Sequence, residues 1–193
     1  MRSEIEAKLK VDSLQAVERR LVECGGSFLR QTIQTDRYYD TAGRDLTRTD
    51  KALRLRTDTK DGRERQILAY KGPKEKDDYK KRVELETQVS DAETTELLLA
   101  ALGYAKALAF DKRRRLWRLG GCEVALDELP LLGAFVEIEG PDSETIARVQ
   151  AMLHLEAAPH IMDSYACLID RELSRLGRDE RQVYLGQCEQ GGK

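Results

Sequence analysis

The chain has 193 residues, of which 40% are hydrophobic and 35% are charged, and this suits one domain with a hydrophobic core. Its 33 basic and 35 acidic residues leave a formal net charge of −2. A general binder of nucleic acid or of membrane surfaces would show a clear basic excess, so both classes are disfavoured and the charges need a local explanation.

The first elements predicted along the chain are a strand with one charged face and a helix. Glu4, Glu6 and Lys8 alternate with apolar residues, and a period of two places them on the same face of a strand. A helical period follows over about residues 13–24 and ends at Gly25-Gly26.

Charged side chains alternate in the same way through the next predicted strands. The sets are Asp36, Tyr38 and Asp40, then Arg54 and Arg56, then the run 67–71 that ends on Lys71, then Arg82, Glu84 and Glu86. Asp61-Gly62 predicts a hairpin turn between two of these strands. The segment 73–81, dense in Lys, Glu and Asp, is interpreted as a long exposed loop and a candidate lid.

The second half of the chain adds three predicted helices and more charged strands. One helix is expected from Ser90, where Ser90 and Glu93 form a capping-box pattern, and the others over about residues 143–155 and 164–176. The charged strand positions are Lys112, Arg114, Asp127, Glu137 and Glu139, and the turns are Gly120-Gly121 and Leu132-Gly133.

The charged strand faces have two interpretations. For any single strand, a charged solvent face of a half-buried antiparallel sheet is the simpler one. Taken together, however, these faces carry few Thr, Ser and Gln. The amphipathic helices also need an apolar surface to pack against, and the apolar faces of the strands supply it. The charged faces then turn towards each other. Because an isolated ion costs on the order of tens of kcal/mol to bury in a dry interior, they are expected to line a wet tunnel.

A tunnel of this kind has a specific chemistry. Carboxylates suit hard cations such as Mg²⁺ or Mn²⁺, whereas Arg and Lys side chains suit phosphate oxygens. The sequence therefore predicts a site for a complex of a metal ion with a polyphosphate. A His-rich metal site and a Ser-His-Asp triad are not expected, because His154 and His160 are the only histidines.

A series of short motifs lies in order along the chain. They are Glu4-Ile5-Glu6-Ala7-Lys8, Asp36-Arg37-Tyr38-Tyr39-Asp40, Leu53-Arg54-Leu55-Arg56, Tyr70-Lys71-Gly72-Pro73, Arg82-Val83-Glu84-Leu85-Glu86, Lys112-Arg113-Arg114, Leu126-Asp127-Glu128, Leu132-Gly133-Ala134-Phe135-Val136-Glu137-Ile138-Glu139 and Ser164-Tyr165. The first resembles the E-x-E-x-K signature of the CYTH family, the triphosphate tunnel metalloenzymes, and the others match that family in order. The family includes class IV adenylate cyclases and thiamine triphosphatases, and the match is nearest to the class IV cyclase-like subgroup.

The resemblance implies an α+β fold in which a closed eight-stranded antiparallel β-barrel has a charged interior and helices packed outside. It also implies roles for individual side chains. The metal-binding acids are Glu4, Glu6, Glu137 and Glu139, with Asp127 as a further candidate. The triphosphate-binding cations are Lys8, Arg54, Arg56, Lys71, Lys112 and Arg114. The catalytic candidates are Lys8, Arg82, Glu84 and Glu86, of which the last three position the nucleophile, hold a second metal or only pair with neighbouring cations.

Two positions depart from the family pattern. Ala69 stands where many relatives carry a polar Thr, and Asp163 precedes Ser164-Tyr165 where a basic residue is common. The change at Ala69 removes one phosphate contact at most. Asp163 is expected to be the N-cap of the last helix.

The resemblance implies an enzyme with Mg²⁺ or Mn²⁺, and two reactions fit the same residues. A class IV adenylate cyclase converts ATP to cyclic AMP and pyrophosphate, and this is the preferred hypothesis. A triphosphatase instead hydrolyses inorganic triphosphate, thiamine triphosphate or a nucleoside triphosphate. A non-catalytic polyphosphate- or nucleotide-binding module is disfavoured because anion binding needs no acids. An RNA-binding domain is disfavoured because Trp117 is isolated beside the basic run 112–115.

The remaining expectations concern boundaries, partners and location. Residues 1–177 are predicted to form one domain, and the polar segment 178–193 is predicted to be a flexible tail. The partner is expected to be a small molecule with a triphosphate group, with no nucleic acid and no membrane, and a homodimer is left open. No apolar run approaches the ~20 residues that span a bilayer, and the first residues lack a signal sequence, so a cytoplasmic location is expected.

Overall fold

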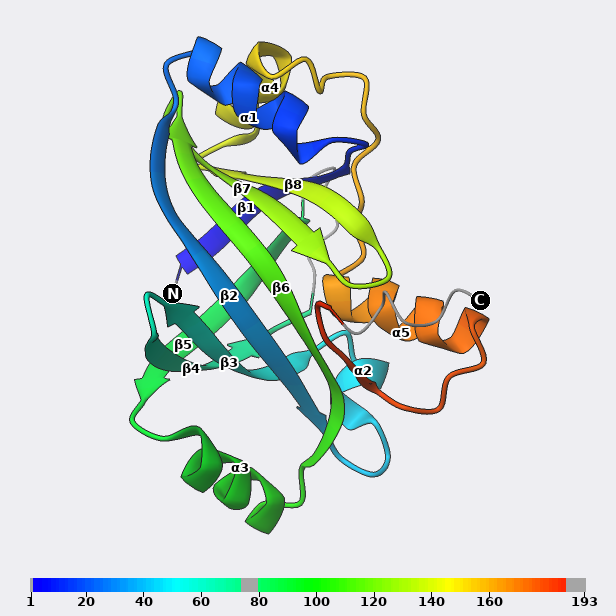
Figure 1. Ribbon diagram of the computed structural model, residues 1–193. Helices are drawn as coiled ribbons and strands as arrows, with labels where there is room; N and C mark the ends of the chain where they lie inside the picture. The colour runs from blue at the N-terminus through cyan, green and yellow to red at the C-terminus, as the bar shows by residue number, and fades with distance from the viewer. Residues whose placement is uncertain (1, 74–79, 187–193) are drawn as a thin grey trace.

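The computed structural model describes residues 2–73 and 80–186. Eight antiparallel strands form its centre: β1 (Arg2–Lys10), β2 (Ser27–Asp40), β3 (Ala52–Lys60), β4 (Arg63–Lys71), β5 (Lys80–Val89), β6 (Ala105–Leu119), β7 (Cys122–Leu129) and β8 (Gly133–Gly140). Their order is β2-β3-β4-β5-β1-β8-β7-β6, and pairing of β2 with β6 closes the ring (Figure 1). The predicted closed eight-stranded barrel is therefore confirmed.

The closing pair of strands is long and coiled. Register between β2 and β6 runs from Ser27 opposite Arg118 to Asp40 opposite Ala105, with shifts at Phe28/Arg30 and at Tyr38/Tyr39. Such bulges bend a strand and increase its twist. They let these two strands wrap around the barrel from one end to the other, as Figure 1 shows.

The predicted hairpin turns are confirmed. Asp61 and Gly62 connect β3 to β4 with φ values of 50° and 71°, and Gly120 and Gly121 connect β6 to β7 with φ values of 58° and 89°. Two consecutive residues with positive φ are the requirement of a type I′ hairpin turn, which explains the glycines. Gly133, with φ 81°, begins β8 after the third predicted turn.

Two helices cover the outer face of β1, β7 and β8. They are α1 (Leu14–Glu23), capped by Ser13, and α4 (Ser143–Met152), capped by Asp142. Their apolar sides meet the outward residues of the strands in the largest hydrophobic cluster, where Val136 and Ile138 are completely buried. In Figure 1 both helices lie together across one end of the barrel.

Three further helices lie elsewhere on the barrel. They are α2 (Asp45–Arg48), α3 (Ala92–Ala101) and α5 (Tyr165–Arg175). The sequence did not predict α2, because the short helix depends on tertiary hydrogen bonds: buried Asp40 accepts from the backbone N–H groups of Leu46 and Thr47, at 3.0 and 2.9 Å. α3 lies at the opposite end of the barrel from α1 and α4 (Figure 1).

Two predicted helix caps are corrected. The expected Ser90/Glu93 capping box is wrong, because Asp91 is the N-cap of α3 and accepts from the Thr94 N–H at 2.6 Å. The expected Asp163 cap is also wrong, because Ser164 caps α5 through the Cys167 N–H. The Asp163 carboxylate instead pairs with Arg171 at 2.9 Å.

The described part of the predicted tail packs against the barrel. Residues Gln182–Val183 form β9, which runs parallel to β6, and Val183 is 1% exposed in the cluster that also contains Ile169 of α5. The prediction of a flexible segment from residue 178 is therefore wrong up to residue 186. The cause is one apolar residue that fits beside α5, which the polar composition hides. Residues 187–193 of the predicted tail, and residues 74–79 of the predicted loop, lie outside the described residues.

Candidate functional site

The interior of the barrel holds a cavity of about 410 Å³, lined by side chains from all eight barrel strands and from the start of α5. Nearly all of the predicted site residues line it: Glu6, Lys8, Arg54, Arg56, Lys71, Arg82, Glu84, Glu86, Lys112, Arg114, Glu137 and Glu139. Their inward orientation, predicted from the period of two, is confirmed. Asp127 lies behind this lining with 0% exposure, and the side chain of Glu4 lies outside the described part of the chain.

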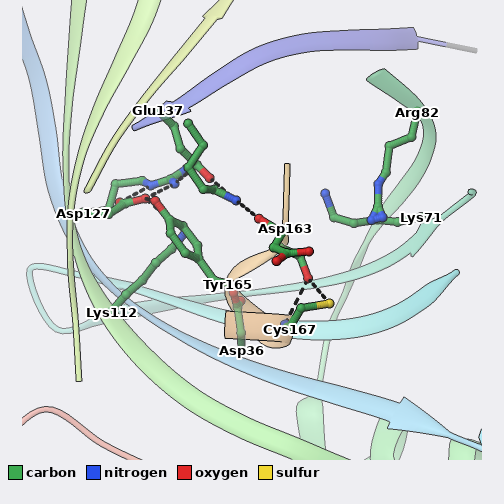
Figure 2. A network of polar contacts seen from close by, with 12 residues as sticks. Asp36, Lys71, Arg82, Lys112, Asp127, Glu137, Asp163, Tyr165 and Cys167 are labelled. Carbon is green, nitrogen blue, oxygen red and sulfur yellow. Dashed lines mark hydrogen bonds and ion pairs between the residues drawn. The ribbon is translucent and has the colours of Figure 1, made fainter. Parts of the chain in front are cut away.

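A first group of ion pairs surrounds Asp127. The carboxylate of Asp127 accepts from Nε of Arg114 at 2.7 Å and from the Tyr165 hydroxyl at 2.9 Å. Lys112 Nζ lies 3.6 Å from the same carboxylate. Figure 2 shows these side chains converging from β6, β7 and α5. We call this set, together with Lys8 and Glu137, the Asp127 cluster.

Glu137 links the remaining members of the Asp127 cluster. Its carboxylate accepts from Arg114 at 2.5 Å and lies 3.3 Å from Lys8 Nζ. Lys8 Nζ also donates to the backbone carbonyl of Asp163 at 3.0 Å. Lys8 and Lys112 are both 2% exposed. These two lysines are thus held inside the protein by several partners on the cavity wall.

Burial and neighbouring charge shift the pKa values in the Asp127 cluster. Burial alone would raise the pKa of Asp127, but the charges of Arg114 and Lys112 outweigh it, so the pKa lies below its ordinary value. Burial, reinforced by the Arg114 guanidinium, lowers the pKa of Lys112 to about 7, although Asp127 acts in the opposite direction. An anion that enters the cavity would favour the charged form of Lys112.

A second group, the Asp36 cluster, lies on β2, β3 and β5. Arg56 donates to Asp36 through Nε and Nη2, at 2.6 and 2.7 Å, which is a bidentate pair. Arg54 Nε lies 3.9 Å from Asp36, and Arg54 Nη2 donates to Glu86 at 3.1 Å. Burial would raise the pKa of Asp36, but Arg56 and Arg54 hold it well below its ordinary value.

A third group places Lys71, Glu84 and Arg82 side by side on β4 and β5. Lys71 forms an ion pair with Glu84, and Arg82 Nε lies 3.9 Å from the same carboxylate. Burial would raise the pKa of Glu84, but the Lys71 charge lowers it. Among the catalytic candidates, the geometry of Glu84 thus favours the role of a partner for cations.

Two buried N–H donors in this lining have no hydrogen-bond partner within the described residues. They are Nε of Arg54 and Nε of Arg82, whose side chains are each 7% exposed. An unsatisfied buried donor is costly, and more so on a charged group. Both arginines line the same cavity, and their guanidinium groups match the chemistry of an anion with several acceptor oxygens.

Carboxylates form a row across three neighbouring strands. Glu6 lies opposite Glu139, which in turn lies opposite Glu123. Directly opposite residues on antiparallel strands have Cβ atoms about 4.5–5.5 Å apart. Within residues 2–73 and 80–186, no three His, Cys, Asp or Glu side chains converge closely enough to form a complete metal site. The row does fit Mg²⁺, which is typically held by one or two carboxylates together with phosphate oxygens and water.

Several residues of the cavity wall were not among the predicted site residues, and Asp36, Tyr165 and Glu123 are the ones that matter for the groups described above. Asp36 and Tyr165 both belong to the quoted motifs, but nothing in their spacing shows that they contact Arg56 and Asp127. Glu123 lies two positions after the turn residue Gly121, and its sequence context is that of an ordinary exposed acid. Glu123, Ala125 and Asp127 alternate at a period of two, so they share one face of the strand, and this pattern could have identified Glu123 as an inward residue.

The comparison with protein families gives one match to most of the chain. A model described as the CYTH domain matches residues 2–155. A proposed adenylate cyclase of Methanocaldococcus jannaschii is 32% identical over 136 residues, which is 70% of this chain and 75% of that protein. The adenylate cyclase CyaB of Aeromonas hydrophila is 31% identical over 138 residues, which is 71% of this chain and 68% of that protein.

Solved structures share the same fold. A Pyrococcus horikoshii protein superposes with a TM-score of 0.76 at 29% identity, covering 87% of this chain and 99% of that one. A Hippeastrum protein, described as a proposed adenylyl cyclase with a dominant triphosphatase activity, has a TM-score of 0.67 at 17% identity, covering 91% and 96%. The described helices include none that is long and apolar enough to cross a bilayer.

Proposed function

Because the chain belongs to the CYTH family, we propose that it is an enzyme that binds the triphosphate group of a small molecule inside the barrel and cleaves it with a divalent metal ion. The observation that carries this proposal is the pair of guanidinium groups of Arg54 and Arg82, each of which has a buried Nε without a hydrogen-bond partner in the described residues. They face a cavity that also contains the cations of Lys8, Lys112 and Arg114. A triphosphate supplies the many acceptor oxygens that such a set of donors requires.

The cations divide into two kinds, which suggests how they share the work. Arg56 and Arg114 are each held by a carboxylate through two hydrogen bonds, so their positions are fixed before a ligand enters. Arg54 and Arg82 also line the cavity, but the Nε of each has no hydrogen-bond partner among the residues that the structure describes. We assign the direct phosphate contacts chiefly to the second kind, together with Lys8, Lys71 and Lys112. Preorganised donors of this sort stabilise charge that develops on the phosphates during reaction.

The row of Glu6 and Glu139, with Glu137 beside it, is the proposed place for Mg²⁺ or Mn²⁺. Glu4 precedes Glu6 by two residues on the same strand and stays a predicted ligand. The bound ion would supply Lewis-acid polarisation of phosphate oxygens. The oxygens of Asp127 already accept from Arg114 and Tyr165, so we propose that Asp127 orients these side chains, and its predicted metal role is the weaker alternative.

For the reaction we favour conversion of ATP to cyclic AMP and pyrophosphate, following the names of the two relatives. The ribose 3′-oxygen forms a bond to the α-phosphorus, its proton leaves to a base, and the bond from that phosphorus to the bridging oxygen breaks, releasing pyrophosphate. Arg54, Arg82 and Lys71 would hold the departing charge. Two acids lie beside them, and Glu86 is the more accessible, because its side chain is 46% exposed and that of Glu84 is 10% exposed.

Hydrolysis of a triphosphate is the second candidate. The activity described for the Hippeastrum protein favours hydrolysis. This reaction needs only a positioned water and the cations assigned above to the phosphates, Arg54, Arg82, Lys8, Lys71 and Lys112, which we call the phosphate clamp. In both cases the partner is a triphosphate-containing small molecule such as ATP, inorganic triphosphate or thiamine triphosphate. The cytoplasmic location and the homodimer stay predictions.

Product analysis separates the two reactions. The protein is incubated with ATP, inorganic triphosphate or thiamine triphosphate, with Mg²⁺ or Mn²⁺, and cyclic AMP, pyrophosphate and phosphate are measured separately. For a cyclase, 3′-deoxy-ATP binds but releases no pyrophosphate, because the nucleophile is missing. Rapid turnover of inorganic triphosphate without cyclic AMP would establish the triphosphatase instead.

The metal assignment is tested with Glu6→Gln, which keeps the size of the side chain and removes its charge. We expect activity to be lost while the unfolding transition is nearly unchanged, since removing one of several neighbouring carboxylates relieves repulsion. Glu23→Gln on the surface of α1 is the matched control. Full activity of Glu6→Gln at limiting Mg²⁺ would contradict the assignment.

A further inference from the structure

Tyr165 is the first residue of α5, a helix outside the barrel whose first turn lines the cavity. Its side chain is nearly buried, with 6% exposure. Its hydroxyl donates to Asp127, and its ring packs against the edge of Phe135 with a centroid separation of 5.3 Å. Figure 2 shows the ring lying among Asp127, Glu137 and Lys112. The ring is therefore fixed at both its polar and its apolar ends.

Two lysines of the phosphate clamp contact this one ring. Lys8 Nζ lies 4.2 Å from the ring centroid and Lys112 Nζ lies 4.9 Å from it. Both distances are within the range of cation–π attraction, which strengthens when the cation is removed from water, as it is here. The ring thus holds two buried ammonium groups at defined positions.

An aromatic ring differs from a carboxylate in what it leaves for the ligand. A carboxylate neutralises the lysine that it binds, and a phosphate must then compete with a full opposite charge. A ring attracts the ammonium group through its quadrupole and carries no net charge. Each lysine already has one carboxylate neighbour, Glu137 for Lys8 and Asp127 for Lys112, and the ring holds it further without adding negative charge that would oppose a phosphate.

We propose that Tyr165 is a positioning residue of the triphosphate site, which holds Lys8 and Lys112 through its ring and Asp127 through its hydroxyl. This inference rests on the proposed function. It also gives α5 a role beyond covering the barrel, because the same segment supplies the Asp163 carbonyl that accepts from Lys8. The start of α5 thereby sets where the lysines on β1 and β6 present their charge.

Titration calorimetry with inorganic triphosphate and Mg²⁺ tests the role of the ring. Tyr165→Leu removes ring and hydroxyl, and Tyr165→Phe removes only the hydroxyl. We expect Tyr165→Leu to weaken binding by about tenfold or more, the loss of one or two desolvated cation–π contacts. Tyr165→Phe should stay within about threefold of the wild type.

Ile169→Ala is the matched control, because Ile169 lies on the same helix and in the same hydrophobic cluster. A purely structural role predicts that Tyr165→Leu and Ile169→Ala lower the melting temperature alike and leave triphosphate affinity unchanged. Coupling is measured by combining Tyr165→Leu with Lys8→Met. If the ring acts through Lys8, the double variant loses clearly less affinity than the sum of the single losses.

Each outcome decides the question. Wild-type affinity in folded Tyr165→Leu overturns this inference alone if Arg54→Ala still weakens binding. A wild-type protein that binds no triphosphate overturns the proposed function and this inference together. Should Tyr165→Leu fail to fold, Tyr165→Met replaces it, because it also removes the ring: a loss of about tenfold supports the inference and wild-type affinity overturns it. A tenfold loss in Tyr165→Phe would instead show that the hydroxyl, and not the ring, carries the effect.

Discussion

The two sides of the barrel differ in how their outer faces are covered. Strands β1, β6, β7 and β8, the covered half, carry α1, α4 and α5 and two large hydrophobic clusters. Within the described residues, strands β3, β4 and β5, the open half, pack against a small cluster around Leu55 and Leu99. On the outer face of β5, Leu85 is 51% exposed, whereas Ile138 at the corresponding face of β8 is 0% exposed.

The ion pairs on the inner face follow the same division. In the covered half, Asp127 is fully buried and Arg114 connects it to Glu137. In the open half, Glu86 reaches solvent, and the Nε atoms of Arg54 and Arg82 make no hydrogen bond to any residue that the structure describes. Dense packing on the outside thus accompanies a fixed charge network on the inside. The less covered side supplies Arg54, Lys71 and Arg82 to the proposed ligand site, and Lys8 and Lys112 join them from the covered half.

The largest expected effect comes from breaking the network of the covered half. Asp127→Asn should reduce the free energy of unfolding by about 3–5 kcal/mol, because Arg114 and Lys112 would keep buried charges with less compensation. Urea unfolding at pH 7 measures the loss. Glu86→Gln in the open half should cost less than about 1 kcal/mol, since that side chain is half-exposed. Equal losses of stability in the two variants would contradict the difference between the covered half and the open half.

The outer faces give the second comparison. Ile138→Ala should cost about 2–5 kcal/mol, the usual range for removing a buried aliphatic side chain. Leu85→Ala should stay within about 0.5 kcal/mol of the wild type, as for most exposed substitutions. Thermal and urea unfolding of both variants check these values. A large loss for Leu85→Ala would show that another surface covers the open half in solution.

The third comparison concerns ligand binding. Arg54→Ala should weaken triphosphate binding by about 1.5–3 kcal/mol through loss of charge-assisted hydrogen bonds, and Arg56→Ala should weaken it less because Arg56 already pairs with Asp36. The loss for Arg54→Ala corresponds to roughly one to two decades in Kd. Arg56→Ala should also destabilise the fold, because it leaves Asp36 buried without its bidentate partner. Arg19→Ala, on α1, serves as the control, and an equal effect there would mean that only overall charge had been measured.

The smallest expected effect is an acid-dependent loss of stability from Asp36. Its folded-state pKa lies below the unfolded value of about 3.9. The contribution of ionised Asp36 to the free energy of unfolding is therefore complete above about pH 4 and is lost as the pH falls towards the folded-state pKa. Between about pH 4 and 2, the unfolding free energy of Asp36→Asn should fall less steeply than that of the wild type, by up to about 1.4 kcal/mol per pH unit. Parallel slopes would contradict this.

The sequence by itself determined the local structure and the direction of the charged side chains. A period of two requires that Arg54 and Arg56, or Glu137 and Glu139, share a strand face, and turn residues such as Asp61-Gly62 mark where hairpins reverse. Amphipathic helices then assign the apolar face to the outside. These are properties of neighbouring residues, so no tertiary information is needed for them.

Only the tertiary structure decided which charges meet. Pairing of β2 with β6 joins segments about eighty residues apart, and such registers depend on the closure of the whole barrel rather than on local sequence. Pairing of β2 with β3 sets Asp36 opposite Arg56, and packing on the closed barrel places Tyr165 of α5 against Lys8 and Lys112 and docks Val183 beside Ile169. Local pattern fixes which way a side chain points, but its partner is fixed by packing between distant parts of the chain.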